Sequence, residues 1–160
     1  MRQHVTHLVA VLALCAWGCN STEPQPEARL FLEVKEVGQE KVEVMVSVEN
    51  GSGLFGAAFD LVYDAQRLSF ESWRPGALMT SGSSAPTGAA ALEDGKPGRV
   101  VAGIALEDPR MVIGKGTGTL MVVTFKKGEV ASPLEGLHLE QAELRGAGNA
   151  PIAVTVQPSK

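Results

Sequence analysis

The feature that most constrains the fold is a regular alternation of side-chain character with a period of two. Between positions 42 and 49, valine fills every second position, and Glu43, Met45, Ser47 and Glu49 stand between the valines. Such a period places neighbouring side chains on opposite faces, which is typical of a strand with one buried face. The pattern recurs along the chain, separated by turn signals such as Asn50-Gly-Ser-Gly53, and no helical stripe interrupts it. The sequence therefore predicts an all-β fold, an antiparallel β-sandwich of about nine strands.

The same pattern locates the individual strands. One strand is predicted from Leu54 to Tyr63 and the next from Leu68 to about Trp73. The turn between them is fixed by Asp64, whose carboxylate can accept hydrogen bonds from backbone N–H groups two or three residues further on. Residues Pro75 to Pro86 are rich in Gly, Ser and Ala and are predicted to be a loop. The remaining predicted strands are Leu30–Val37, Val42–Val48, Ala89–Leu92, Arg99–Leu106, Leu120–Phe125, Leu137–Leu144 and Ile152–Val156.

Three segments carry a resemblance to a known family. They are Gly53–Ser72, with the motif F-D-L-V-Y-D, then Trp73–Leu78 (WRPGAL), and then the glycine-rich turn and long strand of Gly114–Lys126. In this order and spacing they resemble the cohesin family, and the resemblance spans roughly Arg29 to Val156. It implies a sandwich with jelly-roll topology. Ala65 stands where the family usually has proline, so the turn is less restricted by its sequence.

The resemblance also implies a protein partner. Cohesins bind dockerin modules through one sheet face, and type I members carry an Asn and an Asp, two residues apart, on a strand of that face. The alignment places Gly56 and Ala58 at those positions, so the polar contacts cannot be carried over. Gly56, Ala57 and Ala58 form a patch of small residues that suits the close approach of a partner, although tight packing or an edge position would explain it equally well. We take Gly56, Ala58 and Asp60 as the candidate partner-binding residues.

A leader precedes the predicted domain. Its apolar run, Leu8 to Trp17, is too short to span a bilayer as a stable helix, which favours a cleaved signal. Ala16-Trp-Gly-Cys19 resembles a bacterial lipobox, which implies lipidation of Cys19; the alternative is an ordinary secretory leader with a bystander cysteine. We expect a lipoprotein signal peptide over residues 1–18, the lipidated cysteine and a tether over 19–28, and the cohesin-like domain over 29–157. Asn20 favours the outer membrane by resemblance to lipoprotein sorting, so the expected location is the bacterial cell envelope, lipid-anchored or secreted.

Few residues of the predicted domain carry chemistry. It contains one histidine, His138, on the polar face of a strand with no partner arranged beside it. Its carboxylates fall at turns or on polar strand faces. Two acidic pairs, Glu93–Asp94 and Glu107–Asp108, have the oxygen ligands that a turn calcium site needs, and Glu107 and Asp108 are taken as the candidates. No combination of nucleophile and base appears, so no enzyme and no cofactor are expected. The formal net charge of −4, without a basic cluster, argues against nucleic acid as a partner.

Three functions remain open at this point. The first is a surface-anchored, non-catalytic module that binds a dockerin-like or other protein partner, in scaffolding or in polysaccharide degradation, and that touches the membrane through its lipid only. The second is a carbohydrate-binding module, for which Trp73 is the stacking candidate; Phe31 is the other aromatic on the outer side, and two rings make a poor platform. The third is a small hydrolase, which the missing nucleophile–base set opposes.

Overall fold

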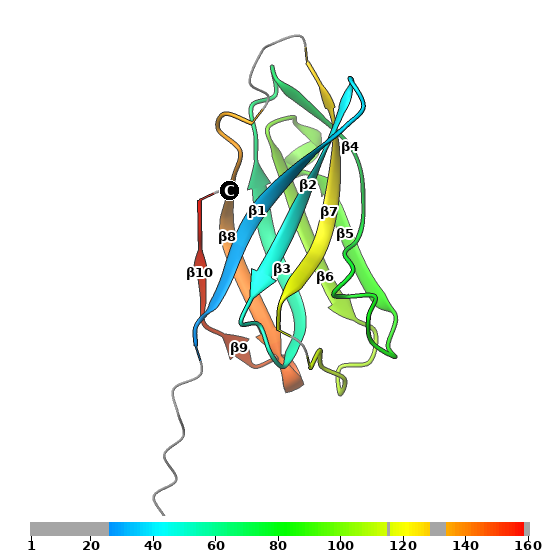
Figure 1. Ribbon diagram of the computed structural model, residues 1–160, viewed down its shortest axis with the longest axis vertical. Helices are drawn as coiled ribbons and strands as arrows, with labels where there is room; N and C mark the ends of the chain where they lie inside the picture. Colours follow the sequence, from blue (N-terminus) through cyan, green and yellow to red (C-terminus); the bar gives the residue numbers. More distant parts are fainter. Residues whose placement is uncertain (1–25, 115, 129–133, 159–160) are drawn as a thin grey trace, which may run out of the picture.

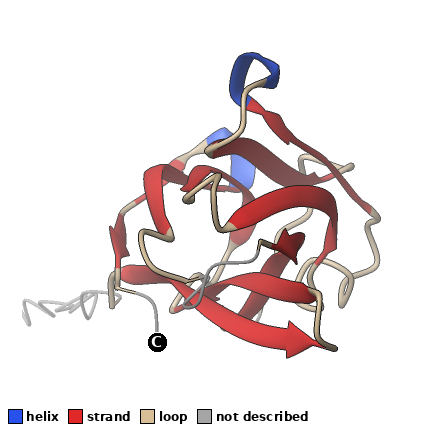
Figure 2. Cartoon of the chain, turned by 90° about the horizontal axis from the view of Figure 1, so that it is seen from above, coloured by secondary structure: helices blue, strands red, loops and turns tan. Residues whose placement is uncertain are grey.

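The structure is a computed structural model that describes residues 26–114, 116–128 and 134–158. These residues form two five-stranded β-sheets packed face to face (Figures 1 and 2). The predicted all-β sandwich is therefore confirmed. The strands are β1 (Ala28–Val37), β2 (Lys41–Glu49), β3 (Leu54–Val62), β4 (Leu68–Pro75), β5 (Pro86–Leu92), β6 (Arg99–Leu106), β7 (Gly118–Lys127), β8 (His138–Gly146), β9 (Pro151–Ile152) and β10 (Val154–Val156), with two short 3₁₀ turns, η1 (Glu93–Gly95) and η2 (Ala147–Asn149).

Each sheet is assembled from strands that are far apart in the sequence. One sheet has the order β10-β1-β2-β7-β4, which we call sheet A, and the other has the order β5-β6-β3-β8-β9, which we call sheet B. Because β2, β3 and β4 alternate between the two sheets, the chain crosses the sandwich repeatedly, as in a jelly roll. All neighbouring strands are antiparallel except β1 and β10, which pair in parallel.

The core lies between the sheets and consists of the side chains that the alternation predicted to be buried. All four alternating valines of β2 are fully buried, and so are Leu61 of β3 and Phe125 of β7. The ring of Phe125 packs against Tyr63, with 4.9 Å between ring centroids, and against Phe70 at 6.2 Å. Burying one such aromatic side chain contributes roughly 1.5–3 kcal/mol. A single continuous apolar layer therefore holds the two sheets together.

The turn between β3 and β4 is closed by Asp64, as the sequence predicts. Its carboxylate accepts hydrogen bonds from the backbone N–H of Gln66 at 2.8 Å and from Nε of Arg67 at 2.9 Å. The backbone N–H groups of Arg67 and Leu68 donate to the Asp64 carbonyl. These contacts fix the turn, although Ala65 stands where the cohesin family usually has proline.

The structure differs from the sequence prediction in three places. The predicted last strand is divided at Ala153, so β9 pairs with β8 in sheet B and β10 pairs with β1 in sheet A. β5 begins at Pro86 rather than Ala89, because its run of Thr, Gly and Ala has no apolar–polar contrast for a pattern to detect. Ala57 does not belong to the small-residue patch: it faces the core and is 6% exposed, whereas Ala58 on the opposite face is exposed.

The predicted leader, Cys19 and most of the tether fall in residues 1–25, outside the described residues. Within the described ranges there is no helix capable of spanning a lipid bilayer.

Candidate functional site

The outer faces of the two sheets differ sharply. The outer face of sheet A carries long charged side chains that pair across strands, such as Lys41 with Glu71 at 2.6 Å and Arg74 with Glu43 at 3.1 Å. The middle of the outer face of sheet B has no long side chain on its three neighbouring strands β5, β6 and β3. Sheet B therefore offers the more accessible backbone surface.

The strand register places small residues of these three strands in two rows across the outer face of sheet B. Ala89, Gly103 and Ala58 lie side by side on β5, β6 and β3, and the next row contains Thr87, Ala105 and Gly56. We call these six residues the small-residue face. They line an open depression of about 440 Å³ that is mainly apolar. The candidate residues Gly56 and Ala58 both belong to it.

Two of the glycines near the depression are required by packing, and one is not. A Cβ added to Gly56 would lie 2.9 Å from both the Ala105 Cβ and the Ile104 carbonyl oxygen, and one added to Gly88 would lie 2.6 Å from the Gly103 carbonyl oxygen. A Cβ at Gly103 would meet only the Ala57 carbonyl oxygen, at the ordinary distance of 3.8 Å. Folding therefore leaves room for a side chain at Gly103, at the centre of the depression.

The depression is bordered by charged and apolar groups. On β8, Arg145 donates to Glu143 at 2.5 Å beside the small-residue face. In the row next to the two rows of the small-residue face, Val101 of β6 points outward and is 46% exposed. The surface thus combines an apolar floor with a polar border, the arrangement found in protein interfaces.

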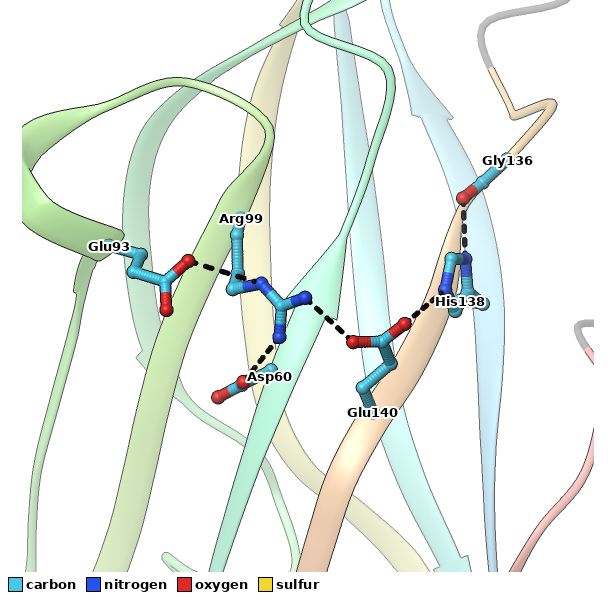
Figure 3. A network of polar contacts seen from close by, with 6 residues as sticks. All are labelled: Asp60, Glu93, Arg99, Gly136, His138 and Glu140. Carbon is cyan, nitrogen blue, oxygen red and sulfur yellow. Dashed lines mark hydrogen bonds and ion pairs between the residues drawn. The ribbon is translucent and has the colours of Figure 1, made fainter.

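Beyond Val101, a group of ion pairs ties three strands together (Figure 3). The guanidinium of Arg99 on β6 contacts Asp60 of β3 at 2.7 Å, Glu140 of β8 at 2.7 Å and Glu93 of η1 at 3.3 Å. We call these four residues, together with His138, the Arg99 cluster. Asp60 was expected on a polar face; it does lie on the outer face, but it is only 7% exposed because the guanidinium pairs with it there. The cluster therefore links β6, β3 and β8 at this end of sheet B.

The electrostatics of the cluster follow from these contacts. The hydrogen bond to Asp60 is the main cause that raises the pKa of Arg99. The Gly136 carbonyl, and then Glu140, raise the pKa of His138, while His138 and Arg99 lower the pKa of Glu140. Both ring nitrogens of His138 face acceptors, the Gly136 carbonyl at 2.8 Å and the Glu140 carboxylate at 3.1 Å. This environment suits the imidazolium form. The expectation that His138 has no partner beside it was therefore wrong.

The His138–Glu140 pair is expected to make stability depend on pH. The raised pKa of His138 stabilises the fold below the unfolded value of 6.5, and this contribution is lost as the pH rises through the folded pKa. The lowered pKa of Glu140 stabilises the fold above 4.5 and is lost as the pH falls through its folded pKa. His138→Gln should therefore lower the thermal midpoint of unfolding at about pH 5.5 and leave it unchanged at about pH 8.5. The decrease at the lower pH should be small, because the pair is exposed. A difference that grows towards alkaline pH would contradict this assignment.

The other candidate residues lie away from the small-residue face. Trp73 of β4 is half-buried, and its ring lies against β5, 3.2 Å from where a Gly88 Cβ would stand, so it covers the side of the sandwich. Phe31 is 6% exposed. These two rings form no exposed aromatic platform.

The candidate calcium ligands lie in the connection after β6. The carboxylate of Asp108 is bound by Arg110, with both of its oxygens accepting hydrogen bonds at 3.0 Å. Those bonds lower the pKa of Asp108. In the part of the chain that the structure describes, no group of three His, Cys, Asp or Glu side chains is arranged to hold a metal ion.

The architecture of this chain is similar to that of solved protein structures. No protein-family model and no curated protein matches the chain. Among solved structures, the type II cohesin A11 of Bacteroides cellulosolvens is similar with a TM-score of 0.66 and 15% identity, over 82% of this chain and 99% of that one. The chain has the cohesin fold.

Two further cohesins show the same likeness. The non-cellulosomal cohesin of the archaeon Archaeoglobus fulgidus is 20% identical, with a TM-score of 0.60 over 81% of this chain and 86% of that one. The sixth cohesin of scaffoldin B from Acetivibrio cellulolyticus, solved in complex with a mutant Cel5 dockerin, is 18% identical, with a TM-score of 0.62 over 81% of this chain and 95% of that one. The family resemblance of the sequence is thus confirmed at the level of the cohesin fold.

Proposed function

We propose that this chain is a non-catalytic binding module that receives a dockerin-like protein partner on the outer face of sheet B. The observation that carries the proposal is the small-residue face, an open apolar depression with a charged border on a chain with the cohesin fold. Several cohesins of this fold were solved in complex with dockerins, which supports a protein of that type as the partner.

The floor of the depression suits close approach by a structured partner. Side chains no larger than alanine and threonine let a helix or strand of the partner lie near the backbone of β3 and β6. Val101 supplies an exposed apolar contact next to it. Interfaces obtain most of their affinity from a few such well-packed central contacts, while the border excludes water.

The mode of contact differs from the one that the family resemblance implies. Gly56 and Ala58 offer no polar side chain, so the partner has no Asn–Asp pair to bind. The polar contacts available instead are the Arg99 cluster and the Glu143–Arg145 pair on β8. The partner therefore packs on the apolar floor and finds its polar contacts at the ends of the face.

A catalytic role has little support in this face. The carboxylates near the depression are paired with arginine, as Asp60 and Glu140 are with Arg99 and Glu143 is with Arg145. A general acid of the glycosidase type needs an apolar site that raises its pKa, whereas the pKa of Glu140 is lowered. A binding role is the better account of these residues.

The anchoring of the module is a further part of the proposal. Cys19 in its lipobox-like segment supports a lipid-anchored module in the cell envelope, with the outer membrane favoured by Asn20. Cys19→Ser should release the protein from the membrane fraction or leave an unprocessed precursor. Unchanged membrane fractionation of that variant would rule out lipidation at this cysteine.

The proposed partner can be sought directly. The purified protein is immobilised, a lysate of the producing cells is passed over it, and retained proteins are identified by mass spectrometry and then titrated by calorimetry. A protein that binds with one-to-one stoichiometry is the expected result. Retention of the module on cellulose or chitin, with no protein partner, would favour a carbohydrate-binding module and overturn the proposal.

A further inference from the structure

Strand β5 forms one edge of sheet B and lacks the features that usually prevent an edge strand from pairing with a strand of another molecule. It pairs with β6 in continuous register from Pro86 to Leu92, without a bulge. It has no charged residue, and its only proline is at its first position. No backbone hydrogen bond between described residues reaches its other edge. An edge of this kind offers its free N–H and C=O groups to another strand.

The other edges are protected. β4, at the edge of sheet A beside β5, is interrupted by a bulge between Phe70 and Ser72 and carries Glu71 and Arg74. β9 and β10 are two and three residues long. Short strands, bulges and charges are the usual devices against edge pairing. Among the four outermost strands of the described sheets, β5, β9, β10 and β4, it is therefore β5 that is open to pairing along its whole length.

We propose that β5 pairs with β5 of a second copy of this chain, antiparallel about a twofold axis at Ala89. The pairing joins two five-stranded B sheets into one continuous ten-stranded sheet. The backbone hydrogen bonds of the new pair would satisfy the free edge of both copies. Each copy has one β5, so the contact closes at two copies.

The sequence of β5 is complementary to itself in this arrangement. With Ala89 on the axis, Thr87 lies opposite Ala91 of the copy, and Gly88 lies opposite Ala90. The acidic Glu93 that follows the strand lies opposite Ala85 rather than opposite its own copy. No like charges therefore face each other along the paired strands, which is the condition for cross-strand stability.

The dimer has a consequence for the outer face. A twofold axis perpendicular to the joined sheet leaves both outer B faces on the same side. The small-residue faces of the two copies, which include Thr87 and Ala89, then become continuous across the axis. The inference stands on the β5 edge and does not require the proposed partner.

Sedimentation and amide exchange of the purified protein test this pairing together. Between about 5 µM and about 500 µM, the mass should rise from one chain to two, and amide exchange in residues 86–92 should slow in parallel. Ala89→Lys places two like charges on the axis and should raise the dimer Kd by at least about tenfold. Ala58→Lys, the same substitution on β3 away from the edge, should leave the dimer unchanged.

Each alternative result contradicts the proposal in its own way. A single-chain mass at every concentration, with exchange in β5 independent of concentration, would show that the edge does not pair with a copy. A dimer that survives Ala89→Lys would place the interface elsewhere. Protection of β5 that appears only with a different protein would make that protein the occupant instead.

Discussion

Replacing Gly103 with tryptophan is expected to weaken partner binding by at least about a hundredfold. Gly103 lies at the centre of the depression, between Ala58 and Ala89, and a Cβ there would meet only the Ala57 carbonyl oxygen, at the ordinary contact distance of 3.8 Å. The indole would fill the volume that the partner needs. Because the site is on the outer face and the added Cβ has room, the free energy of unfolding should stay within about 0.5 kcal/mol of the wild-type value.

Calorimetric titration with the captured partner, alongside denaturant unfolding, measures both quantities. The matched control is Lys35→Trp, which adds the same ring to the exposed outer face of sheet A. That variant should bind as the wild type does. Equal affinity of the Gly103 variant and the wild type would show that the partner does not occupy the small-residue face.

Replacing Gly76 with alanine is expected to destabilise the fold by about 3 kcal/mol. Gly76 follows β4 and runs against the start of β7, where its N–H donates to the Leu120 carbonyl at 2.8 Å. An added Cβ would lie 2.2 Å from the Thr119 carbonyl oxygen and 2.7 Å from the Leu120 carbonyl carbon. These are backbone atoms of a paired strand, so the strands must move apart to accept even one methyl group.

The control for this prediction is Gly103→Ala, the same change of residue where the added Cβ has room. It should alter the free energy of unfolding by less than about 0.5 kcal/mol, since it adds no clash. Both values come from urea unfolding curves of the two variants. Equal destabilisation of the two would mean that the close approach at Gly76 does not control stability.

Much of the fold could be predicted from the sequence because one sheet face is buried. The alternation correctly assigned Phe59, Leu61 and Tyr63 to the core, and the Asp64 turn was predicted from its hydrogen-bonding geometry. Such signals are local: each depends on residues within one strand or one turn. The bend at Ala153 was missed because Ile152, Val154 and Val156 alternate as an unbroken strand would.

The candidate site was only partly predictable, because it depends on which strands are neighbours. Gly56, Ala58 and Asp60 could be placed on one face of β3 from their spacing. The partners that complete the site, Arg99 and Gly103, lie on β6, about forty positions further along the chain, and no local pattern relates β6 to β3. Only the register of the folded sheet brings these residues together.

The central claim, that a protein partner is bound on the outer face of sheet B, is tested most directly by mapping backbone amide signals in NMR spectra during titration with the captured partner. The shifted signals are expected to cluster on β5, β6, β3 and β8, around Gly103 and Ala58. Shifts concentrated on β1, β2, β7 and β4 would place the partner on sheet A and contradict binding on sheet B.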